Sequence, residues 1–217
     1  MKTILGDINL VLSDYSGVIS DDRRPVHECN RLMLAAYGHE HCSFEEAFRD
    51  ERTMDDLLRS FGIKIDTYAE REALFRKHYR EALKSGIVPV IYPDATYFLE
   101  RLRKEGLPVA IVSAHPADNL EEELKTYGID HLINRFYGGT TELKCEIIRQ
   151  ACQDFSVPEE QAVFIGDTSF DVRSAKKARV HSIAITTGYH PAGILQKEKP
   201  EILVSSLTLL LEVLGIC

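Results

Sequence analysis

The sequence predicts an α/β fold, a parallel sheet covered by helices, with a small helical insertion near the N-terminus. Short apolar runs alternate with helical patterns from residue 92 onward, as they do in a parallel sheet. Another apolar run, residues 8–12, stands apart near the N-terminus. Residues 25–85 between them have helical periodicity and no convincing strand. The chain is therefore expected to leave the sheet after its first strand, form a helical unit, and then return.

The predicted strands are short and rich in β-branched or bulky apolar residues. Such runs are typical of strands that are buried on both faces of a sheet. They are residues 8–12, 109–112, 162–165 and 182–185.

Apolar residues at helical spacing predict the helices, and we interpret each stripe as core packing. In the main part of the chain the stripes are Ala95, Phe98, Leu99 and Leu102; Leu120, Leu124 and Tyr127; Leu143, Ile147, Ala151 and Phe155; and Leu207, Leu210, Leu211 and Leu214. Asp94 is expected to cap the first of these helices, and Gly106 to end it. In the insertion, Tyr68, Phe75, Tyr79 and Ala82 line a long helix that ends at Gly86.

The composition narrows the class of protein. The chain has 217 residues, with 34 acidic and 26 basic side chains and a net charge of −8, which disfavours binding to nucleic acid. No apolar run approaches the roughly 20 residues that a membrane span needs. The five cysteines include no CxxC pair, which argues against a disulfide framework and a zinc ribbon. Residues 1–7 do not resemble a signal peptide, so we expect a cytoplasmic protein with no membrane partner.

Polar residues follow three of the predicted strands. Asp14, Ser113 and Asp167 each stand where an apolar run ends, and ligands of open α/β sheets bind at the carboxyl ends of the strands. Each residue also has an ordinary interpretation. Asp14 precedes Gly17 as a turn residue would, and Ser113 suits a helix cap or a turn. The three together favour a site more than any one of them alone.

Two further residues are expected near these strand ends. Lys144 begins a predicted helix, where a lone lysine is normally a solvated surface residue. Asp171 follows Asp167 by four positions and also completes a Thr168-x-x-Asp171 capping box. Carboxylates gathered at one sheet edge repel each other unless a cation is bound. Mg²⁺ suits such oxygen ligands and needs few of them.

With these residues in place, the chain resembles the haloacid dehalogenase-like hydrolase superfamily, in its phosphoglycolate phosphatase-like branch with a helical cap. The family's first motif, Asp-x-Asp-Gly-Thr/Val, is matched by residues 14–18, DYSGV. Ser113 matches the second motif and Lys144 the third, and residues 166–171, GDTSFD, match the fourth motif, Gly-Asp-x-x-x-Asp. The resemblance covers nearly the whole chain. It implies a Rossmann-like catalytic core of residues 1–19 and 88–217 and a helical cap of residues 20–87.

The resemblance also implies a function, that of a Mg²⁺-dependent phosphatase acting on a small phosphorylated metabolite. Asp14 would attack phosphorus and form an aspartyl-phosphate that water hydrolyses. Mg²⁺ would be held by the Asp14 side chain, the Ser16 carbonyl and Asp167, with Asp171 orienting this shell. Ser113 and Lys144 would bind the phosphoryl oxygens.

One position departs from the family pattern. Family phosphatases usually have Asp where this chain has Ser16, and that Asp protonates the leaving oxygen and then activates water. A serine has no useful acidity near neutral pH, and general acid–base catalysis is typically worth about 10²–10⁴-fold. Slow turnover is therefore expected, whereas phosphate binding is not affected.

The cap is expected to set specificity. The resemblance points to a cap loop at residues 49–53, RDERT, in which Arg52 would meet the leaving group of the substrate. Arg52, Arg23 and Arg24 suit a solvated surface equally well. His115 and His190 receive no role from the sequence.

Two alternatives remain open at this point. Ser16 is compatible with a non-enzymatic or weakly active protein that binds a phosphorylated ligand. The missing acid is also compatible with a phosphonate hydrolase, which would need a cap lysine for a Schiff base; Lys64, Lys77 and Lys84 are available but none has a distinctive setting.

Overall fold

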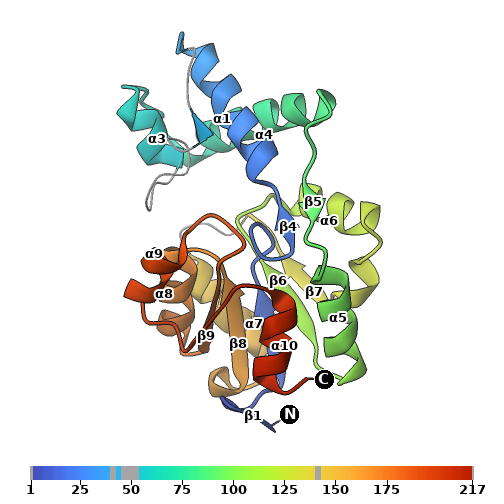
Figure 1. Cartoon of the computed structure of the whole chain (residues 1–217). Coiled ribbons are helices and arrows are strands. Elements are labelled where there is room, and N and C mark those ends of the chain that lie inside the picture. The colour runs from blue at the N-terminus through green and yellow to red at the C-terminus, as the bar shows by residue number, and fades with distance from the viewer. Residues whose placement is uncertain (1, 40–42, 45–53, 140–142, 217) are drawn as a thin grey trace. The chain divides into compact units, whose positions relative to one another are not determined.

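A computed structural model describes residues 2–39, 43–44, 54–139 and 143–216 of the chain (Figure 1). Contacts within the chain divide it into two compact units. One unit, here called the core unit, joins Met1–Asp21 to Ile91–Cys217, and the other, the helical unit, is Asp22–Val90. The helical unit is thus an insertion between the first strands of the core unit and the rest of it.

A six-stranded sheet forms the centre of the core unit. Its strand order is β10-β9-β8-β3-β6-β7, and every neighbouring pair is parallel. The strands are β3 (Leu10–Ser13), β6 (Val109–Val112), β7 (Arg135–Tyr137), β8 (Ala162–Gly166), β9 (His181–Ile185) and β10 (Ile202–Val204). Two short antiparallel strands, β1 (Lys2–Thr3) and β2 (Gly6–Asp7), precede the sheet. The predicted parallel α/β core is confirmed.

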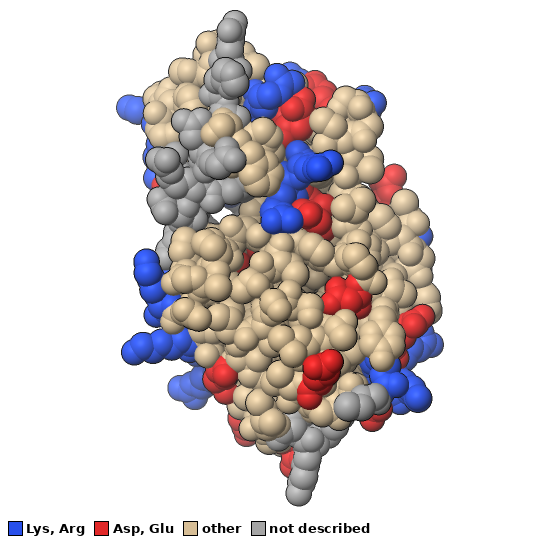
Figure 2. Space-filling model, in the orientation of Figure 1, with Lys and Arg blue, Asp and Glu red and all other residues tan. Residues whose placement is uncertain are grey.

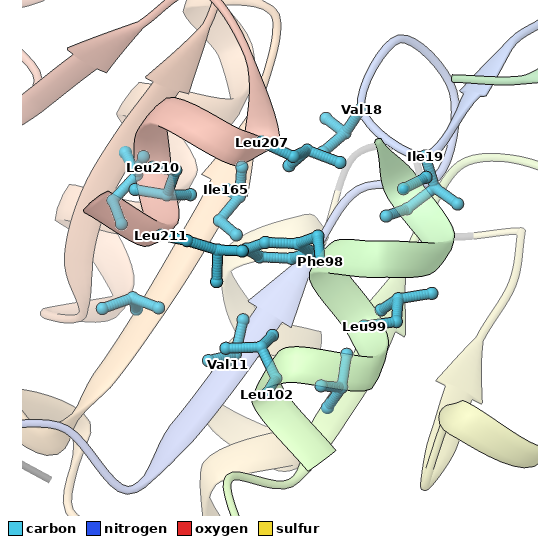
Figure 3. Packing of buried hydrophobic residues seen from close by; sticks show 14 of the residues in the cluster. Val11, Val18, Ile19, Phe98, Leu99, Leu102, Ile165, Leu207, Leu210 and Leu211 are labelled. Atoms are coloured by element: carbon cyan, nitrogen blue, oxygen red, sulfur yellow. The ribbon is translucent and has the colours of Figure 1, made fainter. Parts of the chain in front are cut away.

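Side chains along each strand alternate between the two faces of this sheet, and both faces are covered by helices. On one face Val11 of β3 packs with α5 and α10; Figure 3 shows Phe98 and Leu102 of α5 near Val11, with Leu211 of α10 beside them. On the other face Leu10 and Leu12 of the same strand pack against α7 and α8. The sheet is therefore the middle layer of three, which explains why its strands are continuous apolar runs.

The helices of the core unit largely follow the predicted stripes. They are α5 (Ala95–Lys104), α6 (Ala117–Thr126), α7 (Lys144–Asp154), α8 (Ser169–Ala178), α9 (Ala192–Lys197) and α10 (Leu207–Leu214), with 3₁₀ turns at Asp130–Leu132 and Glu159–Gln161. In α10 all four predicted leucines are buried. In α7 the stripe is displaced by one residue, because Ile148 and Cys152 are fully buried whereas Leu143 is exposed.

Asp94 differs from its predicted role as a helix cap. It occupies the position before α5 but makes no side-chain capping bond there. Its Oδ2 instead accepts hydrogen bonds from the backbone N–H and the hydroxyl of Thr208 in α10, at 3.0 and 3.3 Å. Asp94 therefore joins two helices on one face of the sheet.

The helical unit contains α1 (Arg23–Ala36), α3 (Met54–Ser60) and α4 (Tyr68–Lys84). Its own apolar cluster includes Cys29 and Met33 of α1, Leu57 of α3 and Tyr79 of α4. Thr67 and Glu70 form a capping box at the start of α4, and Gly86 with φ of +84° follows its end. The short strands β4 (Ser20–Asp21) and β5 (Val90–Ile91) pair where the chain passes into and out of this unit.

Charged residues of both signs are scattered among uncharged ones on the face shown in Figure 2. Within the described residues, no helix combines the length and apolar character that crossing a bilayer requires.

Candidate active site

Three neighbouring strands deliver the predicted site residues to one edge of the sheet. β8, β3 and β6 lie side by side in that order and run in the same direction. Asp14 follows β3, Ser113 follows β6 and Asp167 follows β8, so all three stand at carboxyl ends of adjacent strands. All three side chains are buried.

Lys144 joins two of the carboxylates at this edge. Its Nζ donates to Asp14 Oδ2 and to Asp171 Oδ1, both at 2.6 Å, and all three side chains are buried. Nζ also lies 5.5 Å from the centre of the Phe164 ring on β8. The lysine at the start of α7 is therefore part of a buried ion-pair cluster, and the interpretation as a solvated surface lysine is wrong.

Asp171 both caps α8 and contacts the carboxylate cluster through Lys144. Its Oδ2 accepts from the backbone N–H of Thr168 at 3.0 Å and from the Thr168 hydroxyl at 2.6 Å, which completes the predicted capping box of α8. Its Oδ1 is left to accept from Lys144. The cap thus fixes the carboxylate so that one oxygen faces the lysine.

Asp167 is held by a loop after β9 that the sequence did not single out. The backbone N–H of Tyr189 donates to Asp167 Oδ2 at 2.6 Å. A methyl group on Gly188 would lie 2.0 Å from that oxygen, and one on Gly17, whose φ is +76°, would lie 2.2 Å from it. Two glycines from separate loops thus admit this carboxylate. The only available sequence signal is a Gly-Tyr pair shortly after an apolar strand, which is too common to identify a site.

Burial and the neighbouring charges raise the pKa of two of these carboxylates. Burial raises the pKa of Asp167 well above its usual range, and the Asp171 and Asp14 carboxylates raise it further. Burial also raises the pKa of Asp14, against the opposing effect of Lys144. For Lys144, burial would lower the pKa, but the two carboxylates outweigh it and leave it raised. The lysine therefore stays charged, and the carboxylates need more positive charge than it supplies.

The same cluster has the composition of a divalent-cation site. Asp14, Asp167 and Asp171 each offer a carboxylate oxygen, and these oxygens lie within 4.8 Å of one another. Asp167 Oδ1 is buried and has no hydrogen-bond partner among the described residues. Three carboxylates and one ammonium carry a net charge of −2, which a divalent cation would balance. Hard oxygen ligands of this kind suit Mg²⁺ or a similar ion.

Ser113 and Ser16 complete the predicted set. Ser113 is buried, its N–H donates to the Tyr137 carbonyl at 3.0 Å, and its hydroxyl, close to Asp14, partly offsets the rise that burial causes in the pKa of that carboxyl. Ser16 is half-buried in the turn that follows β3, bridged to Ser20. The structure thus brings Asp14, Ser113 and the two other acidic residues together with Lys144.

Four other residues that the sequence analysis named are Arg52, Arg23, Arg24 and His190. Arg52 and the rest of residues 49–53 fall outside the described residues. Arg23 and Arg24 begin α1 in the helical unit. His190, which received no role, accepts a hydrogen bond from the Ser169 N–H at 3.0 Å through Nδ1 and so helps to hold the start of α8.

Comparisons with known proteins identify the family of the chain. The model of the haloacid dehalogenase-like hydrolase family matches residues 11–185. The phosphoglycolate phosphatase of Aliivibrio fischeri is 24% identical over 223 residues, covering 96% of this chain and 97% of that protein.

Solved structures share the fold. A haloacid dehalogenase-like hydrolase from Streptococcus pneumoniae superposes with a TM-score of 0.81 at 21% identity, covering 94% of this chain and 97% of the other. A family hydrolase from Deinococcus radiodurans, solved with bound phosphate and sodium, has a TM-score of 0.73 at 19% identity, covering 96% and 97% of the two chains.

The contact between Gly188 and Asp167 leads to a testable prediction. Gly188→Ala pushes a methyl group into the Asp167 carboxylate, so it should lower the free energy of unfolding by about 1–3 kcal/mol. It should also remove most of the rise in melting temperature that MgCl₂ produces, because Asp167 can no longer face the other carboxylates. Thermal and urea unfolding with MgCl₂ or with EDTA measure both effects.

Gly193→Ala is the matched control, since a methyl group there meets nothing within 4 Å and the residue is in α9. Equal responses of the two variants to MgCl₂ would contradict the prediction.

Proposed function

The chain belongs to the haloacid dehalogenase-like hydrolase family, and on that basis we propose that it is a Mg²⁺-dependent phosphatase that hydrolyses a small phosphorylated metabolite. The observation that carries this proposal is the pairing of Asp14 with Lys144 beside Asp167 at the carboxyl ends of adjacent strands. The similarity to a phosphoglycolate phosphatase supports a small phosphate ester as the substrate class.

Asp14 is the proposed nucleophile. One of its carboxylate oxygens attacks phosphorus, the bond from phosphorus to the ester oxygen breaks, and the ester oxygen takes a proton from water and leaves as the alcohol, because Ser16 cannot donate one. Water then attacks the aspartyl-phosphate, which releases inorganic phosphate and restores the carboxylate. The N–H of Tyr15 donates to Asp14 Oδ1 at 2.7 Å and Lys144 donates to Oδ2, so the carboxylate is held in one orientation before substrate arrives.

Asp14, Asp167 and the Ser16 carbonyl are proposed to hold Mg²⁺, and Asp171 to orient that shell through Lys144. When bound, the cation would neutralise both the carboxylate and the phosphate, which otherwise repel each other. The partnerless Asp167 Oδ1 and the net charge of the cluster support this assignment.

Ser113 and Lys144 are proposed to bind the phosphoryl oxygens. The Ser113 hydroxyl is within hydrogen-bonding reach of Asp14, and Lys144 Nζ is 2.6 Å from the same carboxylate. A phosphoryl group that reaches Asp14 therefore meets a hydroxyl donor and an ammonium donor at once. Donors placed in advance stabilise the negative charge that shifts among the phosphoryl oxygens.

The helical unit is proposed to act as the cap that selects the leaving group. Its insertion directly after the strand that carries Asp14 supports this role. The contact of Arg52 with the leaving group stays a prediction from sequence resemblance.

Ser16 favours a second candidate, a weakly active protein that binds a phosphorylated ligand. Without an acidic side chain at this position, both protonation of the leaving oxygen and activation of water lose their usual group. In that case Asp14 would be phosphorylated by reactive phosphate donors and would lose the phosphoryl group slowly.

Replacing the nucleophile tests the leading proposal. Asp14→Asn should lower phosphate release from p-nitrophenyl phosphate by at least about 10³-fold, because an amide cannot form the phosphoryl intermediate. EDTA should have a comparable effect on the unmodified protein, and added MgCl₂ should restore the activity. Asp130→Asn, in an exposed turn of the core unit, is the matched control. Activity that survives Asp14→Asn would contradict the proposal.

Restoring the missing acid separates the two candidates. Ser16→Asp should raise turnover of alkyl phosphates by about 10²–10⁴-fold, since poor leaving groups depend most on protonation. Steady-state phosphate release and the fraction of trapped phosphoenzyme are the measurements, and that fraction should fall in the variant. If turnover does not rise while Mg²⁺-dependent phosphate binding persists, the ligand-binding candidate is favoured.

A further inference from the structure

A partly buried carboxylate on α6, that of Glu123, joins the two loops that carry Asp14 and Ser113. Glu123 Oε2 accepts from the Tyr15 hydroxyl at 2.9 Å, and Glu123 Oε1 lies 3.0 Å from His115 Nε2. Tyr15 follows Asp14 directly, and the N–H of His115 donates to the Ser113 hydroxyl at 3.3 Å. The rings of Tyr15 and His115 are 5.6 Å apart, so the three side chains form one contact group.

The group is shielded from solvent. Tyr15 is fully buried, His115 is 6% exposed, and the Glu123 side chain is 13% exposed. Burial and the adjacent Glu123 carboxylate raise the pKa of Tyr15, so its hydroxyl stays protonated and donates. Each Glu123 oxygen thus has one partner, the Tyr15 hydroxyl for Oε2 and His115 Nε2 for Oε1. Hydrogen bonds to a charged group in such surroundings are stronger than neutral ones.

The backbone hydrogen bonds of the two loops are made to different neighbouring strands, on opposite sides. Beyond the last paired residues of β3 and β6, the Asp14 N–H donates to Ile165 on β8, whereas the Ser113 N–H donates to Tyr137 on β7. The sheet therefore ties the nucleophile to one neighbour and the hydroxyl to the other. The Ser113 hydroxyl lies close enough to Asp14 to act on its carboxylate, but a phosphoryl group bound between the two loops would separate the two side chains.

We propose that Glu123 is a positioning residue that sets the separation of Asp14 from Ser113 through Tyr15 and His115 when a phosphoryl group lies between them. This inference rests on the proposed phosphatase function. Glu123 touches neither the substrate nor a cation in this account. Its effect is on how well the two loops are aligned for in-line attack, and a misplacement of about 1 Å costs on the order of 10²-fold in rate.

The test measures how fast Asp14 is phosphorylated by acetyl phosphate in a rapid-quench experiment with MgCl₂. This step is chosen because Ser16 slows only the steps that need an acid or a base. Glu123→Gln should lower the maximal phosphorylation rate at least tenfold while the half-saturating concentration changes less than threefold. Glu122→Gln, an exposed neighbour on α6, is the matched control and should behave as the unmodified protein.

Tyr15→Phe provides a second variant that fills the same buried space. It should slow phosphorylation about threefold to tenfold, and the double variant with Glu123→Gln should be no slower than Glu123→Gln alone, because both act through one network. Melting temperatures are measured alongside, so that rates refer to folded protein.

The outcomes separate this inference from the function on which it rests. If the unmodified protein is never phosphorylated and releases no phosphate, the proposed function fails. If the unmodified protein is active and both variants lose stability but keep their phosphorylation rates, Glu123 is a packing residue and the inference is overturned. Additive rate losses in the double variant would overturn it as well.

Discussion

Three buried carboxylates repel one another at one edge of the sheet, and the loops and helix ends around them are arranged to hold them there. Asp14, Asp167 and Asp171 share one small space at the sheet edge, and Lys144 neutralises only part of their charge. Burying ionised groups is costly unless they are paired, so the folded chain must retain protons there or take up a cation. The raised pKa of Asp14 and of Asp167 means that, without a cation, these carboxyl groups retain protons more readily. A divalent ion would replace the protons and leave both carboxylates charged for chemistry.

Each of the three carboxylates is held in place by its own set of hydrogen bonds. The cap of α8 holds Asp171, and the Tyr189 N–H, in a loop that must contain Gly188, holds Asp167. The Tyr15 N–H and Lys144 hold Asp14. None of these supports depends on the helical unit, because all of them lie in the core unit. The sheet and its loops therefore supply the residues of the proposed chemistry. Selection of the substrate is the role proposed for the inserted helices.

The sequence predicts the site residues best where a polar residue directly follows a predicted strand. Asp14, Ser113 and Asp167 each follow an apolar run, and parallel strands bring such positions together, so their proximity could be inferred without coordinates. Lys144 was placed correctly only by family resemblance, since nothing local distinguishes it from a surface lysine. The short edge strands β7 and β10 were missed because three-residue strands with exposed positions lack a clear apolar pattern. Contacts such as Glu123 with Tyr15 span more than a hundred residues and leave no periodic signal.

A crystal structure with Mn²⁺ in place of Mg²⁺ tests the central claim most directly, because manganese can be located by its anomalous scattering. We expect one strong anomalous peak within coordinating distance of a carboxylate oxygen of both Asp14 and Asp167. We also expect the peak to disappear in an Asp167→Asn variant that still folds. A peak elsewhere, or a crystal grown with saturating Mn²⁺ that shows no peak beside Asp14 and Asp167, would contradict this claim.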